Sequence, residues 1–78
     1  MRVIKEFPLT QSIKCTVFSW NGKYIIKLEM GNLEQTYKVS EMDVTGLGDV
    51  DSLLSSPEFC KKAEQIFQTM EQNLDPIF

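Results

Sequence analysis

The chain offers few side chains for catalysis. It contains no histidine, and so it lacks the commonest general base, the usual partner of a nucleophilic cysteine or serine, and the commonest metal ligand. Cys60 falls near a predicted helix start, where the helix dipole can lower the pKa of a thiol. It lies about one turn inside that helix without a base to activate it, so a structural thiol is the preferred interpretation. The sequence predicts that the protein is not an enzyme.

A cluster of acidic residues raises the question of a metal site, because carboxylates are hard ligands for Ca²⁺ and Mg²⁺. The stretch that begins at Asp43 lacks the glutamate that an EF-hand loop requires at its twelfth position, where this chain has Leu54. Gly46 and Gly48 form a G-x-G without the third glycine of a phosphate-binding loop. Helix capping and a solvated loop explain the acids better, so we expect no metal and no cofactor. The cluster comprises Glu41, Asp43, Asp49 and Asp51.

The best candidates for binding are aromatic and basic side chains in and around the stretch FSWNGKYIIK. Large apolar side chains rimmed by polar ones mark contacts between proteins, where tryptophan is a favoured anchor. Aromatic rings among lysines also suit single-stranded nucleic acid, because bases stack on the rings while lysines contact phosphates. The candidate binding residues are Phe18, Trp20, Ile25, Lys14, Lys23, Lys27 and Lys38.

These residues come together if the flanks of Asn21-Gly22 fold into a hairpin. Asn-Gly between runs of β-branched and aromatic residues is the strongest short-range signal for a two-residue turn, and it predicts strands over residues 13–20 and 23–30. In the register that this turn imposes, Phe18 lies opposite Ile25.

A second two-residue turn at Gly31-Asn32 predicts a third antiparallel strand over residues 33–42. Lys14 lies opposite Glu29 in this meander, which predicts a cross-strand ion pair. One face of the sheet is then consistently apolar, and we expect it to face the core. This inner face holds Ile13, Cys15, Val17, Tyr24, Ile26, Leu28, Met30, Leu33, Tyr37 and Val39.

The C-terminal part predicts one amphipathic helix over residues 57–74. Ser56 reads as its N-cap and Pro57 as its first residue. We expect its apolar stripe to pack on the inner face of the sheet. The stripe consists of Phe59, Ala63, Ile66, Phe67, Met70 and Leu74.

The sequence predicts the structure of two further segments less precisely. A short helical turn, capped by Asp49 or Asp51, is expected to bring Val50, Leu53 and Leu54 to the sheet. The first nine residues either form a fourth, edge strand or pack Val3, Ile4, Phe7 and Leu9 against the sheet. The fold class is therefore α+β: a three- or four-stranded antiparallel meander with one C-terminal helix on its inner face.

Size and composition fit one domain over residues 1–78 with a thin margin of stability. The net charge is −3, yet residues 1–40 carry six basic and three acidic side chains, and residues 41–78 carry two basic and eight acidic ones. No signal sequence and no membrane span are evident, so we expect a cytoplasmic protein whose two cysteines are reduced.

Two resemblances bear on the outer face. Hairpins followed by one amphipathic helix, over about residues 12–74, resemble a PUR-type repeat, a sheet-plus-helix module that dimerises and binds single-stranded nucleic acid on its sheet. The basic, arginine-containing strands of that family are largely missing here. The runs FSWNGKYIIK and LEQTYKVSEMDV are similar to small uncharacterised bacterial domains, and this similarity implies a self-contained domain without implying an activity.

Three interpretations of the outer face remain open. The N-terminal segment, or Ile77 and Phe78, covers the apolar side chains; or a protein partner does; or single-stranded nucleic acid binds there. We expect a non-catalytic protein-interaction module that forms a homodimer or other homo-oligomer through this face, or that binds another protein there. Single-stranded nucleic acid is the alternative ligand of the same face.

Overall fold

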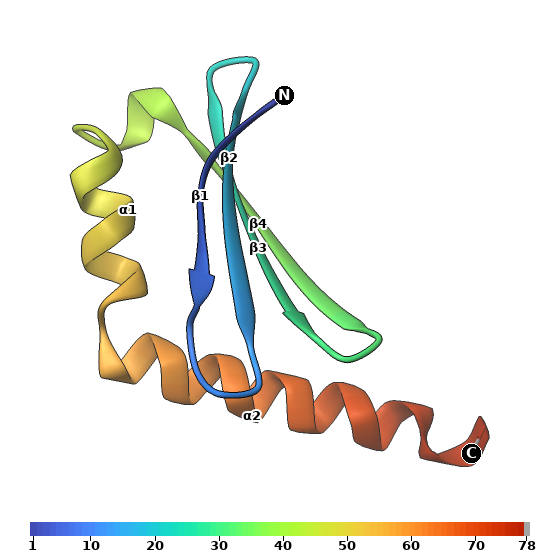
Figure 1. The fold of residues 1–78 in the computed structure, drawn as a ribbon. Coiled ribbons are helices and arrows are strands. Elements are labelled where there is room, and N and C mark those ends of the chain that lie inside the picture. Colours follow the sequence, from blue (N-terminus) through green and yellow to red (C-terminus); the bar gives the residue numbers. More distant parts are fainter. Residues whose placement is uncertain (78) are drawn as a thin grey trace.

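The computed structural model describes residues 1–77 and contains one four-stranded antiparallel sheet. The strands lie next to one another in chain order, so the predicted α+β meander is confirmed (Figure 1). The third predicted strand ends two residues early, because a short 3₁₀ turn occupies Glu41–Asp43. The strands are β1 (Arg2–Pro8), β2 (Lys14–Trp20), β3 (Lys23–Met30) and β4 (Leu33–Ser40).

Two tight turns set the register of the meander. Asn21 and Gly22 have φ values of 50° and 71°, the positive values that a type I′ hairpin turn requires. Gly31 opens the second turn at a φ of 60°. The predicted pairing of Phe18 with Ile25 is confirmed, as is the rest of the register between β2 and β3 and between β3 and β4.

The N-terminal segment forms the fourth strand. β1 pairs antiparallel with β2, and a bulge interrupts the register between Val3 and Lys5. Beyond the bulge, the side chain of Lys5 lies on the inner side, where it pairs with Asp51 and its Nζ lies 5.1 Å from the centre of the Phe7 ring. Of the two predicted alternatives for the N-terminal segment, the edge strand is therefore the one that forms.

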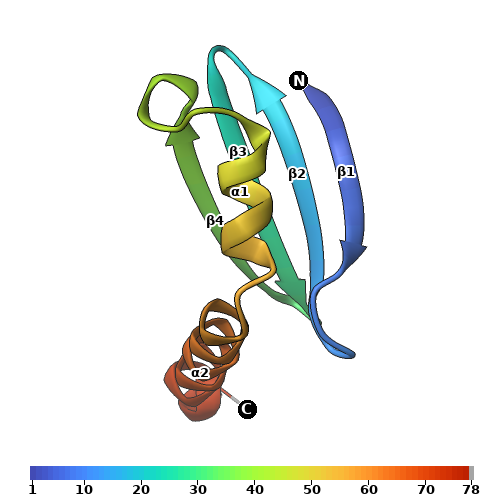
Figure 2. The same ribbon diagram turned by 90° about the vertical axis from the view of Figure 1, so that its left-hand side faces the viewer.

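Two helices lie on the same side of the sheet (Figure 2). Helix α1 (Leu47–Leu54) covers the inner face, and it is longer than the single turn that the sequence suggested. Helix α2 (Pro57–Leu74) has the predicted bounds and runs across the end of the sheet that carries the β1–β2 and β3–β4 connections (Figure 1). A 3₁₀ turn at Asp75–Ile77 follows it.

The helix starts differ in how they are capped. Ser56 caps α2 as predicted, and its hydroxyl oxygen accepts a hydrogen bond of 3.4 Å from the Phe59 N–H. The predicted cap of α1 by Asp49 or Asp51 is wrong, because its N-cap residue is Gly46, which has no side chain to accept a bond. Asp49 instead accepts hydrogen bonds from the N–H and hydroxyl of Thr45, at 2.8 and 3.0 Å.

The core lies between the inner face of the sheet and the two helices. Every residue predicted for the inner face is buried there or packs against the buried cluster. Ile66 and Leu53 were expected to join them but are 43% and 42% exposed. Because α2 crosses the end of the sheet, Ile66 stays outside the core, whereas Phe59, Ala63, Phe67 and Met70 pack in it or against it. The fully buried side chains include Phe67, Ile13, Ile26, Leu28, Val17 and Cys15.

Gln35 is the buried polar link between the sheet and α2. It is 7% exposed, its side-chain amide donates a 3.0 Å hydrogen bond to the Ala63 carbonyl, and its amide oxygen accepts a 2.6 Å bond from the Tyr37 hydroxyl. Buried polar groups need such partners, since leaving one unpaired costs about 1–3 kcal/mol. Gln35 therefore links β4 to α2 by a buried hydrogen bond.

We expect Gln35→Ala to lower the free energy of unfolding by about 1–3 kcal/mol, because it removes the buried hydrogen bond to the Ala63 carbonyl and leaves the Tyr37 hydroxyl without its acceptor. Urea denaturation followed by circular dichroism measures the change. Gln72→Ala, on the exposed side of α2, is the control and should change stability by less than about 0.5 kcal/mol. Equal effects of the two variants would contradict the assigned role of Gln35.

Candidate interaction face

Side chains on the outer face of the sheet form rows across the strands, because residues paired in the register project on the same side. One row runs Val3, Phe18, Ile25, Lys38 across the four strands. Trp20 lies beside it at the end of β2, opposite Lys23. The three predicted apolar residues therefore adjoin one another. We call Val3, Phe18, Trp20 and Ile25 the apolar row.

Members of the apolar row differ in what they offer a partner. Trp20 is 46% exposed and Val3 is 54% exposed, while Phe18 is half-buried. Ile25 is only 6% exposed although no helix of residues 1–77 covers this face. Ile25 is therefore buried among its neighbours. The accessible apolar surface belongs to Trp20, Val3 and Phe18.

Sequence reasoning missed Val3 as part of this surface. The N-terminal segment has no tight turn to set its register, and the bulge after Val3 reverses the alternation between the two faces. Ile4 packs against the core while Val3 points outward beside Phe18. Only the pairing of β1 with β2 reveals this position.

Among the described residues, neither the N-terminal segment nor Ile77 covers the apolar row. The N-terminal segment lies beside β2 as β1 and adds to the row. Ile77 follows the far end of α2 and is 75% exposed, and Phe78, the other residue named in that interpretation, lies outside the described residues. Within residues 1–77, Trp20 and Val3 of the row therefore stay exposed.

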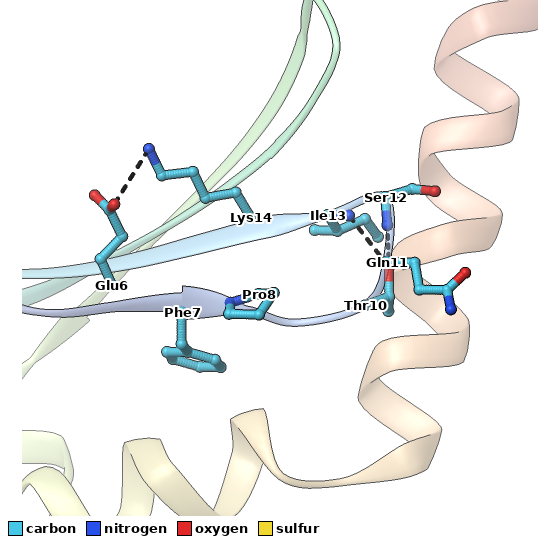
Figure 3. A pocket seen from close by; sticks show the side chains of 8 residues that line it. All are labelled: Glu6, Phe7, Pro8, Thr10, Gln11, Ser12, Ile13 and Lys14. Atoms are coloured by element: carbon cyan, nitrogen blue, oxygen red, sulfur yellow. Dashed lines mark hydrogen bonds and ion pairs between the residues drawn. The ribbon is translucent and has the colours of Figure 1, made fainter.

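Lysines on the outer face are partly neutralised by glutamates. Lys14 pairs with Glu6 at 3.4 Å (Figure 3), so the predicted pair with Glu29 is wrong even though the two residues are opposite in the register. Lys27 lies 3.3 Å from Glu34 and 4.0 Å from Glu29. Within residues 1–77, Lys23 and Lys38 make no ion pair.

A hollow of about 350 Å³ lies at the β1–β2 connection. Figure 3 shows that Glu6 and Lys14 point to one side of the strands and Phe7 to the other. The loop is held by the Thr10 hydroxyl, which accepts 3.2 Å hydrogen bonds from the N–H groups of Ser12 and Ile13. These contacts stabilise a turn and bring no catalytic group together.

The cysteines and the acidic residues singled out in the sequence form no catalytic or metal-binding group among residues 1–77. Cys15 is a fully buried free thiol, and burial raises its pKa from 9.0 to about 11. Cys60 is a free thiol of intermediate exposure whose sulfur lies 3.9 Å from the Leu54 carbonyl oxygen. Hydrogen bonds from Thr45 lower the pKa of Asp49. Over residues 1–77, no three acidic or cysteine side chains are grouped closely enough to hold a metal ion.

Comparison of this chain with protein-family models, with curated proteins and with solved structures found no match. The resemblances to a PUR-type repeat and to small bacterial domains therefore stay predictions. Among the described residues, neither helix combines the length and hydrophobicity of a membrane-spanning segment.

We expect Ile25→Ala to destabilise the protein by about 2 kcal/mol or more, because this side chain is only 6% exposed and its truncation leaves a cavity. Trp20→Ala should cost less than about 1 kcal/mol, since that side chain is half exposed at a strand end. Thermal and urea unfolding of both variants at low protein concentration measure the difference. The reverse order would mean that Trp20 is a structural residue.

Cys60 should react with a thiol reagent in the folded protein, whereas Cys15 should not. Burial shields the Cys15 sulfur and raises its pKa to about 11, so that little thiolate forms near neutral pH. Alkylation of Cys60→Ser and Cys15→Ala with iodoacetamide at pH 8.5, followed by mass spectrometry, assigns each rate. Rapid alkylation of Cys15 without denaturant would contradict the burial.

Proposed function

We propose that this protein is a non-catalytic interaction module that self-associates through the outer face of its sheet. The observation that carries the proposal is the exposure of Trp20 and Val3, at 46% and 54%, on a sheet face that no helix of residues 1–77 covers. Exposed apolar groups with a polar rim are typical of contact surfaces, and a tryptophan is a frequent anchor of such contacts. The lack of histidine supports a role without catalysis.

A second copy of the chain is the favoured partner. The outer face carries both signs of charge, with Lys14 and Lys27 next to Glu6, Glu29 and Glu34, so two such faces can meet with opposite charges paired. A domain of 78 residues buries a smaller fraction of its surface than a larger domain does, and association adds stability by mass action.

Single-stranded nucleic acid is the less favoured ligand of this face. Two of the four predicted lysines, Lys14 and Lys27, are already paired with carboxylates. Glutamates on the same face repel phosphates, whose neutralisation supplies most of the affinity for nucleic acid. Lys23 and Lys38 remain beside the apolar row, and so a direct test is worthwhile.

The fluorescence of Trp20, the only tryptophan, tests the proposal directly. At high protein concentration we expect a blue-shifted emission maximum that moves to longer wavelength on dilution, because dissociation returns the indole to water. A maximum that stays at long wavelength at all concentrations would rule out self-association through this face.

Trp20→Thr should weaken that association at least about tenfold, because the indole is the expected apolar anchor of the contact. Ile66→Thr is the matched control, since Ile66 is 43% exposed but lies on α2 in the other layer. Sedimentation velocity measures both variants. If labelled single-stranded DNA at low salt is retarded by the protein and this binding is lost in Lys23→Ala or Lys38→Ala, the nucleic-acid alternative replaces the proposal.

A further inference from the structure

The two edges of the sheet are not equally protected against pairing. At the β1 edge, a bulge between Val3 and Lys5 and the proline at position 8 interrupt the row of backbone donors. At the other edge, β4 pairs with β3 over eight consecutive residues without a register shift. Among residues 1–77, no strand pairs with the edge of β4 that points away from β3. β4 is visible at the edge of the sheet in Figure 2. An unprotected edge is a template for another strand.

The register identifies the backbone groups that β4 presents. The two residues that flank a two-residue turn form a hydrogen-bonded pair, and such pairs alternate along an antiparallel ladder. Leu33 flanks the turn opposite Met30, so β4 bonds to β3 through every second residue from Leu33 onward. The N–H and C=O groups of the alternate residues point away from β3. These residues are Glu34, Thr36, Lys38 and Ser40.

The side chains of β4 are complementary to a second β4 in antiparallel orientation. With Thr36 on a two-fold axis, Glu34 of each copy lies opposite Lys38 of the other. On the inner face, the same register places Leu33 opposite Val39, both of which are only partly buried in the single chain. A threonine pair, two opposite-charge pairs and two apolar pairs thus coincide in one register.

We infer that β4 pairs with β4 of a second copy, about a two-fold axis at Thr36, and joins the two four-stranded sheets into one continuous sheet. The contact is isologous, and so it closes as a dimer instead of propagating into a fibre. Within residues 1–77, Lys38 has no ion-pair partner, and the second copy supplies Glu34. Glu34 then lies between its own Lys27 and the Lys38 of the second copy.

This edge contact is independent of the proposed contact through the outer face. The two-fold axis is perpendicular to the sheet, so both apolar rows end up on the same side of the joined sheet and stay accessible. The outer-face contact relies on Trp20 and Val3, whereas the edge contact relies on the backbone groups of β4; the side chains of Glu34 and Lys38 lie on the outer face and border both contacts. Dimerisation through the edge is measured in a variant whose outer-face contact is weakened. A negative result for one contact therefore does not contradict the other.

Thr36→Pro tests the edge contact in a Trp20→Thr background, in which the outer-face contact is disabled. Proline removes an N–H that points outward from an edge strand, a position where sheets accept proline, so the monomer should keep its fold. We expect the Trp20→Thr protein to sediment as a concentration-dependent dimer and the Trp20→Thr/Thr36→Pro protein as a monomer with the same circular dichroism. Thr36→Val, which keeps both the N–H and a β-branched side chain, is the matched control and should still dimerise.

Charge exchange tests the register without changing the backbone. In the same background, Glu34→Lys places two lysine pairs across the edge and Lys38→Glu places two glutamate pairs there. Each variant alone should dimerise at least about tenfold more weakly, and an equimolar mixture of the two should form a heterodimer as tightly as the parent forms its homodimer.

Three results would overturn the inference. One is a Trp20→Thr protein that stays monomeric up to about millimolar concentration, where even weak dimers are populated. Another is a Thr36→Pro variant that folds and still dimerises like its parent. The third is a mixture of Glu34→Lys and Lys38→Glu that associates no better than either variant alone, which would exclude this register.

Discussion

The Asn21-Gly22 turn is the constraint on which the arrangement of the sheet depends. Its two positive φ values close the hairpin between β2 and β3 with no free choice of register. A shift of one residue would exchange the two faces and place Phe18 and Trp20 in the core in exchange for Val17 and Ser19. β1 and β4 pair with this hairpin, and the Gly31 turn and the bulge after Val3 then decide which face each of their side chains occupies.

The one-sided cover of the sheet explains its unequal faces. Both helices pack on the inner side and bury residues such as Ile26 and Phe67 completely. On the outer side, which no helix of residues 1–77 covers, Ile25 and Thr16 are nevertheless only 6% and 4% exposed. Their cross-strand neighbours are larger side chains, Phe18 beside Ile25 and Lys27 beside Thr16, and these reduce access to solvent. The outer face therefore combines buried side chains, Ile25 and Thr16, with the exposed side chains of Trp20 and Val3.

Charged and apolar side chains occupy different ends of the outer face, just as basic and acidic residues are unequally divided between the two halves of the chain. The end of the sheet near the β1–β2 connection carries the ion pairs of Lys14 with Glu6 and Lys27 with Glu34, whereas the apolar row lies toward the Asn21-Gly22 turn. A surface that combines an apolar region with both signs of charge suits a protein partner better than a polyanion. The same mixture of charges on β4 makes that edge complementary to itself.

Local signals in the sequence were sufficient for the hairpin, the register of β2 to β4, the inner face and the bounds of α2. Each follows from a turn dipeptide, an alternation of period two, or a cap followed by proline, all of which act over a few residues. Contacts between distant segments decided the rest. The bulge that turns Val3 outward, the pairing of Lys14 with Glu6, the link from Gln35 to Ala63 and the crosswise position of α2 that leaves Ile66 exposed each depend on two segments meeting in space. No local pattern encodes such a meeting, because its energy exists only once the sheet and helices have packed together.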